Sequence, residues 1–128
     1  MVLSRKVLIV EDDNAMAQMC AKLLQRRGHS AVIAGSGEAA LGIVKTVAVD
    51  AVLSDIQMPQ MSGVELLTEL RAFDAALPVI LMTGYASVVT SAEAFSLGAA
   101  DYLTKPFNAE TLIGSLERSF LKKIPQAV

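Results

Sequence analysis

The stretch Ala51-Val52-Leu53-Ser54-Asp55 decides the fold, because it is an apolar run that brings one carboxylate to its end. Pro59 follows closely and cannot donate a hydrogen bond to a sheet, so we expect a strand over 51–55 that stops at or near Asp55. Open parallel sheets place their functional residues at such strand ends. An isolated aspartate would be interpreted as a turn residue, so the importance of Asp55 depends on its companions.

Apolar runs and helical spacings alternate through the rest of the chain. Further strands are predicted at residues 7–10, 31–34, 78–82 and 101–104. Helices are predicted to begin at Asn14 and Val88, and three more are predicted to follow the N-cap residues Ser36, Ser62 and Asn108. The inward face of the first helix is predicted to carry Met16, Met19, Cys20 and Leu23.

Strict alternation of strands and helices predicts an α/β fold with a parallel sheet covered on both faces. For five strands, we expect a flavodoxin-like doubly wound sheet in the order 2-1-3-4-5 with five helices. Residues 1–128 are expected to form a single domain with its core at about 5–122. This order places the ends of the first and third strands on either side of one crevice.

The composition is that of an ordinary globular domain, with 53% hydrophobic residues and a net charge of −2. It argues against direct nucleic-acid binding, and the apolar run at 7–10 is too short for a signal core or a membrane span. A cytoplasmic protein is expected. Cys20 is predicted to be a buried, inert thiol, and His29 is predicted to be a surface or edge residue.

Acidic residues follow the first and third predicted strands. Glu11, Asp12 and Asp13 come directly after residues 7–10, and Asp55 ends the third strand. Such a cluster of like charges persists only if protons or a cation offset the repulsion. Oxygen ligands select Mg²⁺, Ca²⁺ or Mn²⁺, and a few carboxylates completed by water fit Mg²⁺ best. With a single histidine in the chain, a zinc site is not expected.

The fourth and fifth strands add two further polar groups at the same edge. Thr83 supplies a hydroxyl and Lys105 supplies a cation. A carboxylate nucleophile, a metal site, a hydroxyl and a lysine are the groups that phosphoryl transfer requires, because its catalysis is mostly positioning and neutralisation of charge.

Taken together, the residues at these strand ends and their neighbours resemble the response-regulator receiver domain of two-component signalling, and the resemblance covers essentially the full length of the chain. The matching segments are Val7-Leu8-Ile9-Val10-Glu11-Asp12-Asp13, Ser54-Asp55-Ile56-Gln57-Met58-Pro59 with Ser62-Gly63, Met82-Thr83-Gly84, and Tyr102-Leu103-Thr104-Lys105-Pro106-Phe107. The resemblance implies that Asp55 accepts a phosphoryl group from a sensor histidine kinase or a histidine phosphotransfer protein. It implies that the chain catalyses only its own phosphorylation and dephosphorylation.

The resemblance also implies the metal ligands. Asp12 and Asp55 would bind Mg²⁺ directly, with Mn²⁺ as a substitute, the main-chain carbonyl of Gln57 would be a third ligand, and Glu11 would act through water. Asp13 would cap the following helix instead of binding metal.

The remaining roles implied by the resemblance concern switching. Lys105 would pair with the acceptor and then with the phosphoryl group, Thr83 would move onto the phosphate, and Tyr102 would rotate inward behind it. The signal would be a changed surface on the fourth helix, fifth strand and fifth helix. The Lys105-Pro106 bond is expected to be cis. Gln57 and Tyr85 are expected to tune hydrolysis, and a large ring at 85 predicts slow autodephosphorylation.

Three other classes of protein fit these residues less well. A flavodoxin would need a phosphate cradle where this chain has three acids, and an aspartyl-nucleophile phosphatase would need a second acid where Asp55-Ile56-Gln57 has none. A receiver-like interaction module that is never phosphorylated would not need the complete acceptor set. The sequence leaves open the downstream protein target, a fused output domain and phosphorylation-dependent homodimerisation.

Overall fold

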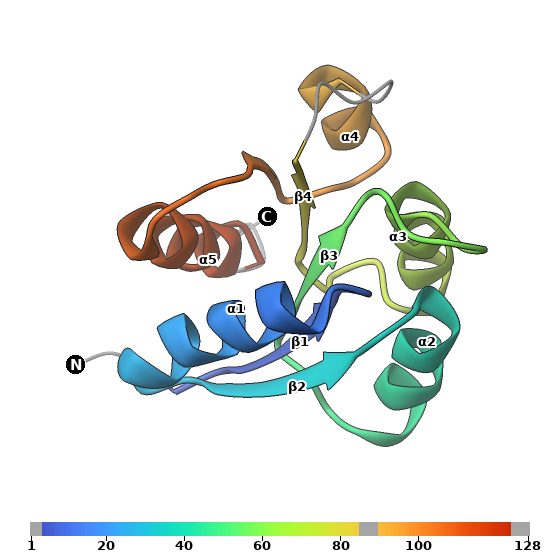
Figure 1. Cartoon of the computed structure of the whole chain (residues 1–128). Coiled ribbons are helices and arrows are strands. Elements are labelled where there is room, and N and C mark those ends of the chain that lie inside the picture. The colour runs from blue at the N-terminus through green and yellow to red at the C-terminus, as the bar shows by residue number, and fades with distance from the viewer. Residues whose placement is uncertain (1–3, 85–89, 124–128) are drawn as a thin grey trace.

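A computed structural model describes residues 4–84 and 90–123, in which strands and helices alternate (Figure 1). The strands are β1 Lys6–Val10, β2 Ser30–Ala34, β3 Ala51–Asp55, β4 Val79–Thr83 and β5 Asp101–Thr104. The helices are α1 Asn14–Arg26, α2 Gly37–Thr46, α3 Gly63–Phe73, α4 Ser91–Ser96 and α5 Ala109–Lys123.

The strands form one parallel sheet in the order β2-β1-β3-β4-β5, which confirms the predicted doubly wound flavodoxin-like topology. Every residue of the central strands β3 and β4 is buried, which is why both strands begin with a continuous apolar run and carry polar residues only at their carboxyl ends. The register pairs Val10 with Ser54, Asp55 with Met82, and Thr83 with Thr104. The carboxyl ends of β1, β3, β4 and β5 therefore meet at one edge.

Helices cover both faces of the sheet. Figure 1 shows α1 and α5 on one face and α2, α3 and α4 on the other. Successive strand residues alternate between the two cores: Val52 packs on the α2 and α3 side, whereas Leu53 packs with α1 and α5. The helix starts follow the predicted caps, since the Ser36 and Ser62 hydroxyls accept hydrogen bonds from Ala39 N and Glu65 N. The Lys105–Pro106 peptide bond is cis, as predicted.

The inward face of α1 differs from the predicted one. The buried side chains are Ala17, Cys20, Ala21 and Leu24. The prediction for Met19 was wrong, because Met19 is 41% exposed, while Met16 and Leu23 pack only partly against the core. Small alanine side chains let the helix lie close to the sheet, and the larger methionines are left at its flank. Cys20 is buried as predicted, and burial raises the pKa of its thiol to about 11.

His29 was predicted to be a surface or edge residue, and the surface part of that prediction was wrong: His29 directly precedes the edge strand β2, but it is buried. His29 is 6% exposed, and its Nδ1 accepts a hydrogen bond from the Arg5 main-chain N–H at 3.1 Å. This hydrogen bond lies at the end of the sheet opposite the acidic residues. The main-chain hydrogen bond from Ser30 N to Arg5 O, at 2.9 Å, joins the same two segments. Burial lowers the pKa of His29, which keeps the ring neutral and its Nδ1 an acceptor.

The fourth helix begins later than predicted. It starts at Ser91 because Thr90 is its N-cap: the Thr90 hydroxyl accepts from Glu93 N at 3.1 Å, and the Glu93 carboxylate accepts from Thr90 N at 3.3 Å. Residues 88 and 89, where the helix was predicted to begin, lie outside the described residues.

Candidate functional site

The end of β1 delivers three acids into different environments. Glu11 is 2% exposed and tied to β2 by the hydrogen bond from its main-chain N–H to Ala34 O at 3.1 Å, whereas Asp12 is exposed. The Asp13 carboxylate accepts from Ala15 N at 3.0 Å and from Met16 N at 3.2 Å. Asp13 is therefore the N-cap of α1, as the resemblance implied.

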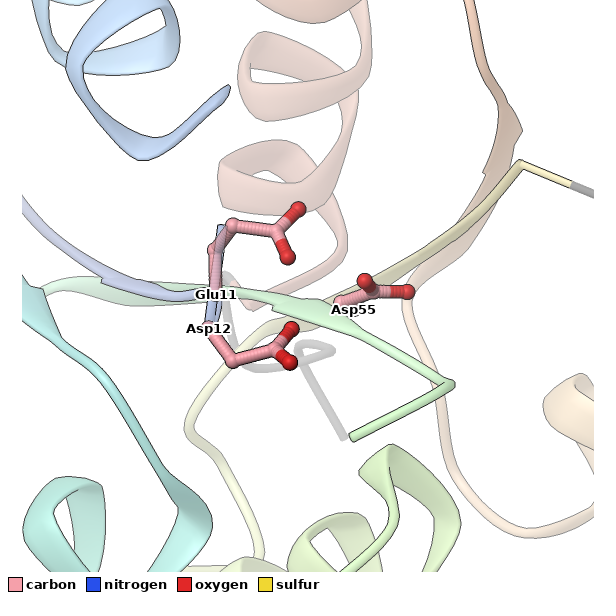
Figure 2. A group of neighbouring side chains, drawn as sticks. All are labelled: Glu11, Asp12 and Asp55. Carbon is pink, nitrogen blue, oxygen red and sulfur yellow. The ribbon is translucent and has the colours of Figure 1, made fainter. Parts of the chain in front are cut away.

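Asp55 ends β3 with its side chain turned toward these acids. It is 7% exposed, and its Oδ1 accepts a hydrogen bond from Gln57 N at 3.1 Å. One ligand oxygen each from Glu11, Asp12 and Asp55 lies within 4.8 Å of the others. Figure 2 shows these carboxyl groups gathered into one space, two from the end of β1 and one from the end of β3. The crevice predicted between the first and third strands is therefore present.

Lys105 offsets part of this negative charge. Its Nζ lies 2.6 Å from Glu11 Oε1 and 3.2 Å from Asp55 Oδ2. Sequence reasoning gave Lys105 only the acceptor as partner, and the shorter contact to Glu11 was missed. Burial would lower the pKa of Lys105, but its two carboxylate partners outweigh that effect and raise the pKa above its usual 10.5, so the ammonium stays charged.

Glu11 carries the most perturbed carboxyl group. Burial raises its pKa from 4.5 to about 7; the hydrogen bond from Lys105 acts against this increase, and the Asp55 charge adds to it. Three carboxylates and one ammonium leave net negative charge in this space. Such a set of hard oxygen donors suits a divalent cation of the Mg²⁺ or Mn²⁺ type.

A cleft of about 360 Å³ opens over these groups. Its lining residues are Glu11, Asp12, Asp13, Asp55, Gln57, Gly84 and Lys105. Gly84 was quoted from the sequence only within the segment Met82-Thr83-Gly84, and no role in the site was predicted for it. Its place directly after Thr83 at a strand end was the available signal, because a missing side chain leaves space at the rim of a site.

The two candidate switch residues lie behind the cleft and do not line it. Thr83 is 1% exposed at the end of β4, and its carbonyl accepts from Lys105 N at 2.7 Å. Tyr102 is half-buried and packs against the core shared with α2, α3 and α4. Tyr85, the candidate for tuning hydrolysis, lies outside the described residues.

Fold and site together define the class of an α/β domain with an acidic, lysine-bridged crevice at its topological switch point. The chain matches the family model described as the response regulator receiver domain over residues 7–117. It is 42% identical to the response regulator protein FleR of Pseudomonas aeruginosa, covering 96% of this chain and 26% of that protein. It is 39% identical to the transcriptional regulatory protein ZraR of Escherichia coli, covering 88% of this chain and 26% of that protein.

Solved structures agree with this assignment. The structure described as FIXJ-N superposes with a TM-score of 0.85 at 31% identity, covering 99% of this chain and 100% of that one. The chemotaxis protein CheY4 of Vibrio cholerae superposes with a TM-score of 0.84 at 33% identity, covering 91% and 99%. The chain belongs to the response regulator receiver family.

The chain spans about a quarter of the length of FleR and ZraR. Among residues 4–84 and 90–123, none of the helices combines the length and apolar character needed to cross a membrane.

Proposed function

We propose that this chain is a phosphoryl-accepting receiver and that Asp55 is the acceptor. The observation that supports the proposal is the position of the Asp55 carboxylate, which is nearly buried at a strand end, 3.2 Å from the Lys105 ammonium, and opens onto a cleft. A carboxylate in that position is accessible to a donor only through the cleft. An interaction module that is never phosphorylated would have no use for this arrangement.

In the proposed reaction, an oxygen of Asp55 attacks the phosphorus of a phosphohistidine on a sensor histidine kinase or a phosphotransfer protein. The O–P bond forms as the N–P bond breaks, and the imidazole leaves with its electron pair and takes a proton. Lys105 neutralises charge on the transferred oxygens. The chain would catalyse only this transfer and the later hydrolysis of its own acyl phosphate.

Mg²⁺, with Mn²⁺ as a substitute, is the proposed cofactor. The carboxylates of Asp12 and Asp55 and the main-chain carbonyl of Gln57 would hold it, and Glu11 would act through water. The convergence of three acidic side chains within 4.8 Å supports this ligand set. When bound, the ion would neutralise the phosphoryl oxygens and orient them toward the acceptor.

Phosphorylation would be read out at a distance through Thr83 and Tyr102. A phosphoryl group adds negative charge and acceptor oxygens, which would draw in the Thr83 hydroxyl and the Lys105 ammonium. Tyr102 would then fill the vacated space, and the surface of α4, β5 and α5 would change. Gln57 at the rim and Tyr85 beyond Gly84 would control access of water, and we expect slow autodephosphorylation.

The proposed partners are a histidine kinase or phosphotransfer protein and either a downstream protein or a fused output domain. FleR and ZraR extend well beyond the part that matches, since this chain covers 26% of each. We place the chain in the cytoplasm, as one receiver unit over 1–128 with a core at about 5–122, without direct nucleic-acid contact. A phosphorylation-dependent homodimer through α4, β5 and α5 is a further arrangement to test.

Incubation with acetyl phosphate and Mg²⁺ followed by intact-mass measurement tests the proposal. The parent chain should gain one phosphoryl group, and Asp55→Asn should gain none. Asp74→Asn, an exposed aspartate at the end of α3, should behave as the parent. Phosphorylation of Asp55→Asn to the parent level, or none on the parent, would overturn the assignment.

A further inference from the structure

The first residue of α3 lies directly against the proposed acceptor. A Cβ atom on Gly63 would overlap the main-chain carbonyl oxygen of Asp55 and would lie 2.8 Å from the Cα atom of Ile56. The obstacle is main chain, which cannot swing aside as the end of a side chain can. Gly63 does not have a positive φ, so the close approach, and not an unusual backbone conformation, requires glycine here.

A second group contacts the same carbonyl oxygen. The Ser54 hydroxyl, fully buried, donates a hydrogen bond to the Asp55 carbonyl oxygen at 3.0 Å. Ile56 is also hydrogen-bonded through both of its main-chain groups: its N–H donates to Met82 O at 2.9 Å, and its carbonyl oxygen accepts from Gly63 N at 2.9 Å. The main chain just after the acceptor is thus held between β4 and the start of α3.

The Asp55 carboxylate depends on this held segment. Its Oδ1 accepts a hydrogen bond from Gln57 N at 3.1 Å, so the main chain two residues later orients the side chain. A side chain at position 63 would have to push either α3 or this segment. The helix resists, because Leu66, Leu67 and Leu70 are fully buried in the core. Part of the displacement would therefore fall on residues 55–57.

We propose that Gly63 and Ser54 are positioning residues that aim the Asp55 carboxylate by holding the main chain just after it: the Ser54 hydroxyl binds the Asp55 carbonyl oxygen, and Gly63, whose N–H binds the Ile56 carbonyl oxygen, leaves room for the Asp55 carbonyl. This inference rests on the proposed function and extends it to residues that do not line the cleft. A misplacement of about 1 Å costs up to about 100-fold in the rate of a positioned reaction. Disturbing either residue should therefore reduce phosphorylation and cation binding while the domain remains folded.

The test compares Gly63→Ala and Ser54→Ala with two matched controls. Gly42→Ala places the same methyl on a helical glycine with nothing within 4 Å. Ser119→Ala removes a buried hydroxyl that donates to a main-chain carbonyl, Ser115 O, at 2.7 Å, but in α5. For each protein, urea unfolding gives stability, the EPR signal of free Mn²⁺ gives cation affinity, and acetyl phosphate gives the phosphorylation rate at saturating Mn²⁺.

Under conditions where every protein is fully folded, Gly63→Ala should lower the phosphorylation rate by about 10-fold or more, and Ser54→Ala by roughly 3-fold, both with weaker Mn²⁺ binding. Gly42→Ala and Ser119→Ala should keep the parent rate and affinity, although Ser119→Ala loses stability. A rate that follows stability across all four variants would show a merely structural role and overturn the inference.

Two outcomes separate this inference from the proposed function. If the parent chain takes up neither Mn²⁺ nor phosphate, the proposed function fails first. If the parent is active and Gly63→Ala matches it, the positioning inference alone fails. Should Gly63→Ala not fold, Ser54→Ala decides, because it only removes a hydroxyl: parent rate and affinity would overturn the inference, and losses of both would support it.

Discussion

Lys105 is the side chain whose contacts explain how buried acids can share one end of the sheet. It bridges Glu11 and Asp55, so the two buried carboxylates of this cluster have a cation beside them, whereas Asp12 is exposed to water. The sequence predicted Lys105 and all the acids at this edge, because parallel strands end together. It could not predict that Glu11 is the nearer partner, since that depends on how far the Lys105 side chain reaches past the ends of β4 and β3.

His29 gives a prediction about pH, because its neutral Nδ1 accepts from Arg5 N. Burial lowers its pKa below 6.5; the charge of Glu117 acts against this shift and that of Arg5 adds to it. The unfolded chain therefore binds a proton more readily, and stability should fall as pH drops below about 6.5. His29→Asn keeps an acceptor and does not titrate, so it should lose less stability between pH 7.5 and 5.5.

Urea unfolding at several pH values measures this difference. Glu11 titrates in both proteins and its raised pKa acts in the opposite direction, so only the difference between parent and His29→Asn reports on His29. Parallel stability curves for the two proteins would contradict the prediction.

Among the elements, α4 is held least firmly in the described part of the chain. It has six residues and buries only Ala94, whereas α1 has thirteen and buries four. Phe95 is 45% exposed and Leu97 is 42% exposed. The predicted start of this helix was wrong because β-branched residues fit the apolar pattern, while the Thr90 capping box that sets the boundary is a local hydrogen-bond arrangement.

Hydrogen exchange should find the α4 amides protected less than those of α1, because few buried contacts oppose local opening. The comparison uses amides within the helical hydrogen-bond pattern of each element, measured at one pH by mass spectrometry of peptides or by NMR. Equal protection of the two helices would refute this view of α4 as the element most able to move.

The turn between α4 and β5 contains Gly98, at which any side chain would introduce strain. Gly98 has a φ of 101°, and a Cβ atom there would lie 2.8 Å from Arg71 Cδ of α3. Gly98→Ala should destabilise the domain by about 1–3 kcal/mol, since a side chain disfavours this conformation. Gly42→Ala, in open helix, should instead be neutral or stabilising by up to about 1 kcal/mol. Denaturant midpoints measure both changes, and equal midpoints for the two variants would be inconsistent with this account.

For the molecule as a whole, the sequence predicted the architecture more accurately than it predicted which side chains are packed in the core. Five apolar runs separated by helical spacings predicted a parallel sheet, because right-handed crossovers bury both of its faces. The strand order could not be read from this pattern and was expected from the arrangement common to five-stranded doubly wound sheets, which the structure confirms. The side of α1 that faces the sheet was mispredicted at Met19, since hydrophobicity ranks methionine above alanine while close packing selects Ala17 and Ala21. Burial of His29 was missed because it depends on the pairing of the chain just before β1 with the start of β2, where Arg5 N donates to the imidazole.

Crowding of the acids should also affect the stability of the entire fold. Without a divalent cation, Asp12→Asn removes one of the repelling charges, so its melting temperature should exceed that of the parent. With Mg²⁺ about 100-fold above its dissociation constant, binding adds about 2.7 kcal/mol to the parent, or roughly 5–10 °C. Asp12→Asn should gain far less, so the order of the two melting temperatures should reverse.

Calorimetry with EDTA or with Mg²⁺ measures the melting temperatures of both proteins. Glu69→Gln, which changes an exposed acid on α3, is the control. An equal gain in Asp12→Asn would show that Asp12 does not hold the ion.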